Sequence, residues 1–104
     1  MERGEVWWAD LPKPVGRRPV VILSRSRAIQ VRDYVTVAEV TTTIRDIPVE
    51  VVLDREDGLP RRCVVNFDVI NTIPKKLLNE RIVILTMAKM KAIESALKFA
   101  LTIA

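Results

Sequence analysis

Short runs of β-branched and aliphatic residues, broken by prolines, glycines and charged turns, fill most of the chain before Thr86. Such runs are typical of strands, and the breaks between them are typical of turns. Several short strands at close spacing favour a small, strongly curved antiparallel sheet or barrel. The runs predict strands at Glu5–Leu11, Pro19–Ser24, Tyr34–Thr41, Val49–Leu53, Cys63–Phe67, Val69–Ile73 and Arg81–Leu85, with weak helical character at Arg25–Arg32 and Pro74–Leu78.

The spacing of apolar residues changes after Thr86. Steps of three and four residues are typical of an amphipathic helix, and a threonine suits the N-cap position. We expect this helix to pack its apolar stripe on the sheet or on a second subunit. The stripe consists of Met87, Met90, Ile93, Leu97, Ala100 and Leu101.

The length of 104 residues fits one domain, which we expect to span residues 1–104. No apolar run approaches the roughly 18 residues that a membrane helix needs. The N-terminus, MERGEVWW, has charges where a signal peptide would be apolar. These features predict a cytoplasmic protein without a membrane partner.

The chain contains no histidine and a single cysteine, Cys63. These counts exclude histidine-ligated metals, a histidine base, an intrachain disulfide and a cysteine-rich zinc site. Cys63 lies among valines, so we expect it to be a small buried hydrophobe. We therefore expect no metal and no cofactor, and any catalysis would rest on Arg, Lys, Asp, Glu, Ser, Thr or Tyr.

The net charge of +4 makes an anionic partner plausible, either nucleic acid or an acidic protein segment. Two arginines stand at the start of the second expected strand, in GRRPVVILS. Because side chains alternate along a strand, Arg18 should share a face with Val20, Ile22 and Ser24, while Arg17 points the other way. An arginine held there can present its donors to a phosphate. A salt bridge or a solvated strand end is the alternative.

Two further segments carry polar side chains at strand ends. In EVTTTIR, Thr41 closes a strand while Thr42 and Thr43 enter a loop, and threonine hydroxyls and loop amides are common phosphate contacts. In VVNFDVINT, the asparagines and Asp68 can read base edges or orient a ribose, or simply form a turn.

Taken together, RGEVWWADL, GRRPVVILS, VAEVTTTIRDIPVEVVL, VVNFDVINTI and the closing helix resemble the MazF/PemK (Kid) toxins of bacterial toxin–antitoxin systems. The resemblance extends from Arg3 to the end of the chain. It implies a mainly β fold, a small SH3-like antiparallel β-barrel of the MazF/PemK/CcdB-like type with a C-terminal α-helix. It also implies a homodimer.

The resemblance implies a sequence-specific, metal-independent endoribonuclease. Such toxins cleave single-stranded RNA, often mRNA, and leave a 2′,3′-cyclic phosphate and a 5′-hydroxyl. In many members the arginine before the proline and the strand-ending threonine form the catalytic pair, which corresponds here to Arg18 and Thr41. Further expected RNA contacts are Arg17, Ser24, Thr42, Thr43, Asp68 and Asn71.

The expected chemistry agrees with these residue types. Attack of the 2′-hydroxyl on the phosphorus places charge on the phosphoryl oxygens, which Arg18 can neutralise while Thr41 holds the phosphate. The general base stays open, with Glu39 and Asp68 as candidates. The chain also departs from the family in two places. Its LPKPVGRR loop is shorter than in many members, and Asn71 stands where many members carry a basic residue.

The expected protein partner is an antitoxin with an acidic, disordered tail that folds along the basic groove. Two other functions remain open at this point. A CcdB-like toxin that poisons DNA gyrase would share the barrel, and a non-catalytic RNA-binding barrel would share the basic surface. Intact Arg18 and Thr41 favour the ribonuclease.

Overall fold

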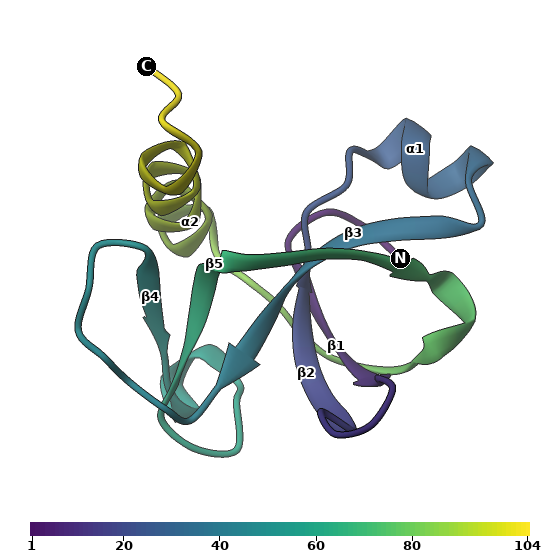
Figure 1. Ribbon diagram of the computed structural model, residues 1–104, viewed down its shortest axis with the longest axis horizontal. Coiled ribbons are helices and arrows are strands. Elements are labelled where there is room, and N and C mark those ends of the chain that lie inside the picture. Colours follow the sequence, from purple (N-terminus) through teal and green to yellow (C-terminus); the bar gives the residue numbers. More distant parts are fainter.

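The computed structural model describes all 104 residues as one six-stranded sheet with helices on its two faces (Figure 1). Every strand pairing is antiparallel, and the strand order is β4-β5-β3-β2-β1-β6. The strands are β1 (Glu5–Asp10), β2 (Arg17–Ile22), β3 (Tyr34–Thr41), β4 (Glu50–Leu53), β5 (Cys63–Pro74) and β6 (Leu78–Ile84). The helices are α1 (Ser26–Val31), η1 (Arg55–Asp57), η2 (Lys75–Leu77) and α2 (Met87–Leu101), where η denotes a single 3-10 turn.

The sheet curls into a half-barrel whose two edge strands, β4 and β6, are not hydrogen-bonded to each other. The turn after β4 comes close to β6, because a Cβ added at Gly58 would lie 2.9 Å from the Cβ of Val83. Packing of Val83 of β6 against Gly58 therefore brings the two edges of the sheet together where no backbone hydrogen bonds join β4 and β6. The expected mainly β, antiparallel fold with a C-terminal helix is confirmed.

Alternation along the strands divides the core between the two faces of the sheet. On one face, which we call the α2 face, Val6 and Val21 pack in a cluster with Ile93 of α2. On the opposite face, the α1 face, Val20 and neighbouring residues pack with Ile29 of α1. The strands β1, β2 and β3 are thus buried on both sides, which makes them a rigid support for residues at their ends.

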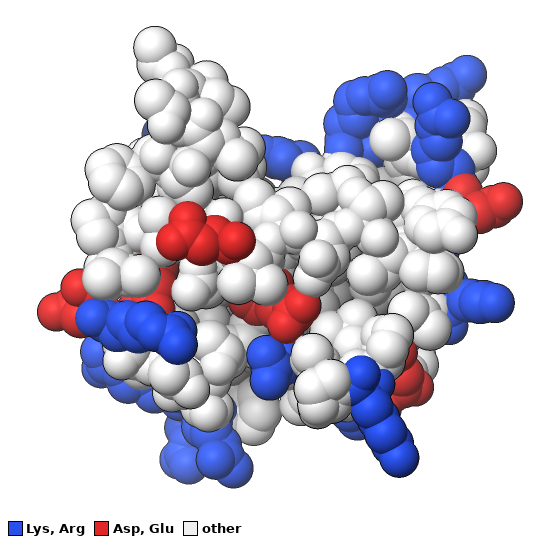
Figure 2. Space-filling view, in the orientation of Figure 1, with Lys and Arg blue, Asp and Glu red and all other residues white.

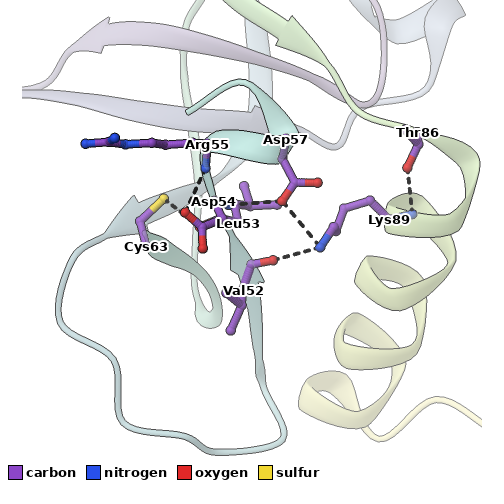
Figure 3. Close-up of polar contacts among 8 residues, drawn as sticks. All are labelled: Val52, Leu53, Asp54, Arg55, Asp57, Cys63, Thr86 and Lys89. Carbon is purple, nitrogen blue, oxygen red and sulfur yellow. Dashed lines mark hydrogen bonds and ion pairs between the residues drawn. The ribbon is translucent and has the colours of Figure 1, made fainter. Parts of the chain in front are cut away.

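Helix α2 is joined to the sheet at its N-terminal turn (Figure 3). The Thr86 hydroxyl caps the helix by accepting from the Lys89 backbone N–H at 3.2 Å, as the sequence predicted. The Lys89 ammonium donates to the Val52 carbonyl at 3.0 Å and lies 3.4 Å from an Asp57 carboxylate oxygen. Val52 belongs to edge strand β4, so this lysine covers part of a free sheet edge.

The apolar stripe of α2 packs on the sheet through its middle turns. Ile93 is buried, and Met90, Leu97 and Ala100 are partly buried against the same cluster. Met87 and Leu101, at the two helix ends, do not pack on the sheet and remain exposed, whereas Ala96 is buried. None of the helices is long and apolar enough to cross a membrane.

The main differences from the predicted element boundaries lie in β5, β6 and β2, where pairing across the sheet overrides local pattern. The segments Cys63–Phe67 and Val69–Ile73 form one continuous strand, β5, since both parts pair with β3. Strand β6 begins at Leu78 because it pairs with Ala9 of β1. Strand β2 spans Arg17–Ile22, so both arginines belong to the strand and Ser24 lies beyond its end.

Candidate active site

A bulge in β5 creates the surroundings of the candidate site. Ala38 of β3 pairs with Ile70, but Val40 pairs with Val65, so the segment 66–69 lies opposite Glu39 alone. The extra residues bend β5 sharply (Figure 1). Bulges of this kind often lie next to active sites, where they redirect side chains. Within the bulge, the Asp68 N–H donates to the Asn66 side chain at 2.8 Å, and the Phe67 N–H donates to the Val49 carbonyl at 3.0 Å.

An open depression of about 190 Å³ lies between this bulge, the start of β2 and the end of β3. It brings Arg18 and Thr41 together, although they are far apart in the sequence. Both side chains project on the α1 face. Arg18 lies two residues before Val20, whose strand partner is Glu39, and Thr41 lies two residues after Glu39. The depression is lined by Arg18, Glu39, Thr41, Thr43, Arg45, Asn66 and Val69.

Arg18 forms an ion pair at the floor of the depression. Its Nη1 donates to Glu39 Oε1 at 3.2 Å, and the Asn71 amide donates to Glu39 Oε2 at 2.7 Å. The Glu39 side chain is 11% exposed and that of Arg18 is 34% exposed. A guanidinium has five N–H donors in a fixed plane, so the bond to Glu39 orients Arg18 and leaves further donors for an anion.

The Thr41 hydroxyl is oriented by the loop that follows it. Its oxygen accepts from the Thr43 backbone N–H at 3.2 Å, so its own O–H can donate outward. The loop is held by the Glu50 carboxylate, which accepts from the Arg45 N–H at 3.0 Å and from the Asp46 N–H at 2.9 Å. These bonds place Arg45 on the rim of the depression.

The other residues expected to contact RNA are distributed over several places. Thr43 lines the depression, and Thr42 lines a neighbouring hollow of about 110 Å³ that also contains Thr41 and Trp8. Arg17 lies on the opposite face, with its guanidinium carbon 4.8 Å from the ring centre of Trp8. Asp68 is exposed on the bulge and does not line the depression.

The side chains of Ser24 and Asn71 are among the expected contacts that take part in internal hydrogen bonds. The Ser24 hydroxyl accepts from the Thr36 N–H at 2.8 Å, and Ser24 lines a different depression beside α1. The interpretation that Ser24 extends the face of Arg18 along the strand was therefore wrong, because β2 ends at Ile22. Asn71 lies on the α1 face and is bonded to Glu39.

The adjacent tryptophans lie on opposite faces of β1, and each is half-buried. Trp7 packs against the α1-face cluster, and its indole N–H donates to the Glu5 carboxylate at 2.8 Å. Burial by itself would raise the pKa of Glu5. The bonds from Trp7 and the Glu2 N–H, together with the positive charges of the N-terminus and Arg81, lower that pKa overall. Glu5 is thus a buried, ionised residue that stabilises β1 through these bonds and does not belong to the candidate site.

From the sequence, charge alone made Arg45 a candidate RNA contact, Val69 was not a candidate, and no signal indicated that Glu39 contacts Arg18. The contact of Glu39 with Arg18 depends on strand register, which the sequence does not display. No group of three or more His, Cys, Asp or Glu side chains in the chain is arranged to hold a metal ion.

Charge is unevenly spread over the face shown in Figure 2, where basic side chains gather over α1 and along the lower margin. Arg27 lies in α1, and Arg25 and Arg32 flank it at the helix ends. Acidic side chains lie near the middle of this face and in smaller patches at its margins. The surface thus offers several basic regions for a polyanion.

Comparisons with known proteins agree with this arrangement. A family model described as a PemK-like, MazF-like toxin of type II toxin-antitoxin system matches residues 2–101. The chain is 44% identical over 99 residues to the probable endoribonuclease MazF5 of Mycobacterium tuberculosis, a match that covers 94% of this chain and 90% of that protein.

Solved structures give the same result. The fold matches an endoribonuclease in complex with its cognate antitoxin from a mycobacterial species, with a TM-score of 0.90, 33% identity, and coverage of 100% of this chain and 97% of that one. It also matches the M. tuberculosis toxin MazF-mt6, with a TM-score of 0.88, 33% identity, and coverage of 96% and 98%. The chain therefore belongs to the family of PemK-like, MazF-like toxins of type II toxin–antitoxin systems.

Proposed function

We propose that this toxin-family chain is a metal-independent endoribonuclease that cleaves single-stranded RNA at specific sequences. The observation that carries the proposal is the meeting of Arg18 and Thr41 in one open depression, each with donors still available. The names of the relatives support the same activity, since both the M. tuberculosis homologue and the mycobacterial structure are called endoribonucleases. These names favour RNA cleavage over a gyrase poison.

In the proposed reaction, the ribose 2′-oxygen attacks the adjacent phosphorus while the bond from phosphorus to the 5′-oxygen breaks. The products are a 2′,3′-cyclic phosphate and a 5′-hydroxyl. Arg18 neutralises the charge that develops on the phosphoryl oxygens, and the Thr41 hydroxyl donates to one of them. Both groups are pre-oriented by protein hydrogen bonds, so little reorganisation is needed when the phosphate binds.

The RNA strand beyond the scissile phosphate would lie along the loop that follows β3. Thr43 and Arg45 line the same depression, and Arg45 has a guanidinium without an ion pair. We therefore add Arg45 to the proposed phosphate contacts. Arg17, Thr42, Asp68 and Asn71 remain proposed contacts on the surrounding surface, and Ser24 is the most remote of them, because it lines a separate depression.

The test uses purified protein and a mixed-sequence RNA in EDTA, with the cut sites mapped and the new ends analysed. Arg18→Ala and Thr41→Ala are compared with Arg62→Ala, an exposed arginine outside the depression. We expect wild type to leave 2′,3′-cyclic phosphates, and Arg18→Ala to lower kcat by about 100-fold or more, as loss of a transition-state donor does. A folded wild type that cuts none of many RNAs would contradict the proposal.

The alternatives predict other results in the same preparation. A gyrase poison would inhibit supercoiling by DNA gyrase without cutting RNA. A non-catalytic barrel would retard RNA in a gel and leave it intact. Either outcome would replace the ribonuclease proposal.

We further propose a homodimer and an antitoxin with an acidic, disordered tail, with the action of both in the cytoplasm. Large apolar side chains remain exposed on α2, including Phe99 and Leu101, and a second copy would cover such a surface. Light scattering should give twice the chain mass of 11.8 kDa. A single-chain mass at all concentrations would exclude the dimer. Co-expressed product of a small acidic reading frame beside the gene should stop RNA cleavage.

A further inference from the structure

We propose that Glu39 is the general base of this site and accepts the proton of the attacking 2′-hydroxyl. The inference rests on the proposed ribonuclease function and adds a catalytic residue to it. It starts from the position of Glu39, which is the only carboxylate among the residues lining the depression.

Glu39 is held in one orientation by residues from two neighbouring strands. Arg18 on β2 donates to one carboxylate oxygen, and Asn71 on β5 donates to the other. Each carboxylate oxygen has two lone pairs, so each can accept one more hydrogen. The bulge at 66–69 keeps β5 from pairing with β3 directly at Glu39. The carboxylate is therefore fixed in the open depression, with 11% of the side chain exposed.

The spacing of Glu39 and Thr41 suits one nucleotide. Residues two apart on a strand project on the same face, roughly 6.6 Å apart along the strand. When Thr41 and Arg18 hold the scissile phosphate, the ribose that carries the 2′-hydroxyl can lie toward Glu39 or away from it. With the ribose toward Glu39, the 2′-hydroxyl lies between the carboxylate and the phosphorus, as in-line attack requires.

The other candidate bases are occupied or distant. The chain has no histidine. Neither Glu50 nor Asp68 lines the depression, and the Glu50 carboxylate holds the loop by accepting from the Arg45 and Asp46 N–H groups. The charged groups that line the depression with Glu39 are Arg18 and Arg45, so the base faces cations that also bind the phosphate.

The step balances without a further reactant. The 2′-hydroxyl proton moves to a Glu39 oxygen as the bond between the 2′-oxygen and phosphorus forms. The bond from phosphorus to the 5′-oxygen breaks, and the 5′-oxygen takes a proton from water. Glu39 then gives its proton to the hydroxide left behind, and the carboxylate is restored. Arg18 stays protonated throughout.

The neutral side chain at position 71 fits this role. Asn71 orients the carboxylate without adding a second positive charge to it. A basic residue there would form another ion pair with Glu39.

The test measures single-turnover cleavage of one defined oligonucleotide by Glu39→Gln from acid to alkaline pH. Glutamine keeps an oxygen acceptor for Arg18 but cannot take the proton. We expect the cleavage rate to fall by about 100-fold or more, with affinity for a 2′-deoxy analogue of the substrate unchanged. We also expect the wild-type rate to fall in acid, and this acid limb to be missing in the variant. Glu56→Gln, an exposed carboxylate on η1, is the matched control.

Two outcomes would overturn the inference while leaving the ribonuclease in place. One is a Glu39→Gln rate within a few-fold of wild type with the same pH profile, which would mean that Glu39 only positions Arg18. Should Glu39→Gln fail to fold, Glu39→Asp is used, which keeps the carboxylate but withdraws it by one methylene. We expect it to retain the acid limb at a rate lower by about 10-fold or more, and an unchanged rate is the second contrary outcome. A wild type that cleaves no RNA would instead defeat the proposed function itself.

Discussion

At the scale of single residues, Cys63 shows how burial of one thiol links stability to pH. Burial, followed by the nearby carboxylates of Asp54 and Asp57, raises the pKa of Cys63 from 9.0 to about 11 (Figure 3). The folded state thus favours the neutral thiol. This contribution to stability is complete below pH 9 and is lost as the pH rises toward 11, because the unfolded chain ionises first.

We expect the difference in unfolding free energy between wild type and Cys63→Ala to shrink by about 2 kcal/mol from pH 8 to pH 11. Urea denaturation at several pH values measures it. The cavity left by alanine affects the difference equally at every pH, so only its pH dependence reports ionisation. Parallel pH curves for the two proteins would contradict the assignment.

Two glycines with positive φ angles differ in the space around them. Gly58 has a φ of 94° and lies against Val83 of β6, whereas Gly16 has a φ of 71° with nothing within 4 Å of an added Cβ. We expect Gly16→Ala to cost about 1 kcal/mol of stability for the left-handed backbone. Gly58→Ala should cost about 2–4 kcal/mol, because it adds a steric clash to the same backbone penalty. Equal unfolding midpoints in urea would show that the turn can move away from β6.

At the scale of elements, Lys89 joins α2 to the free edge of β4. Its bonds to the Val52 carbonyl and Asp57 are only partly exposed to water, so they are worth more than a surface ion pair. We expect Lys89→Met, which keeps most of the stem, to lower the unfolding free energy by about 1–2 kcal/mol. Lys91→Met, on an exposed position of the same helix, should change it by less than about 0.5 kcal/mol. Equal effects in urea denaturation would remove Lys89 from the contact between helix and sheet.

The same elements show what the sequence could and could not predict. The strand Tyr34–Thr41 has its predicted bounds, because its alternation and composition are strong local signals. Strand β5 was predicted as two pieces, since a bulge resembles a turn in sequence and only pairing with β3 shows that the strand continues. The family was recognised from its motifs and is confirmed. The contact of Arg18 with Glu39 could not be predicted from the sequence, because it depends on the register of β2 against β3.

At the scale of the whole molecule, a net charge of +4 should govern how tightly the proposed RNA substrate binds. Each phosphate contact releases condensed counterions, so the affinity falls with salt at a slope of about −0.7 per contact for single strands. The proposed cationic contacts are Arg17, Arg18 and Arg45. If each binds one phosphate, we expect kcat/KM to fall about 20-fold between 50 and 200 mM KCl. The chemical step should respond much less, because Arg18 and Thr41 act on the phosphate after it is bound.

A variant of Arg45, the arginine on the rim of the depression, distinguishes specific phosphate binding from attraction of RNA by the net charge. Arg45→Met should make the slope of log kcat/KM against log salt shallower by about 0.7, because it removes one phosphate contact. Lys91→Met removes the same charge from α2, on the opposite face of the sheet from Arg18, and should leave the slope unchanged. Equal changes in both variants would mean that net charge alone attracts RNA. The depression lined by Thr41 and Arg45 would then make no specific contribution to RNA binding, and the RNA strand would have to follow another path over the molecule.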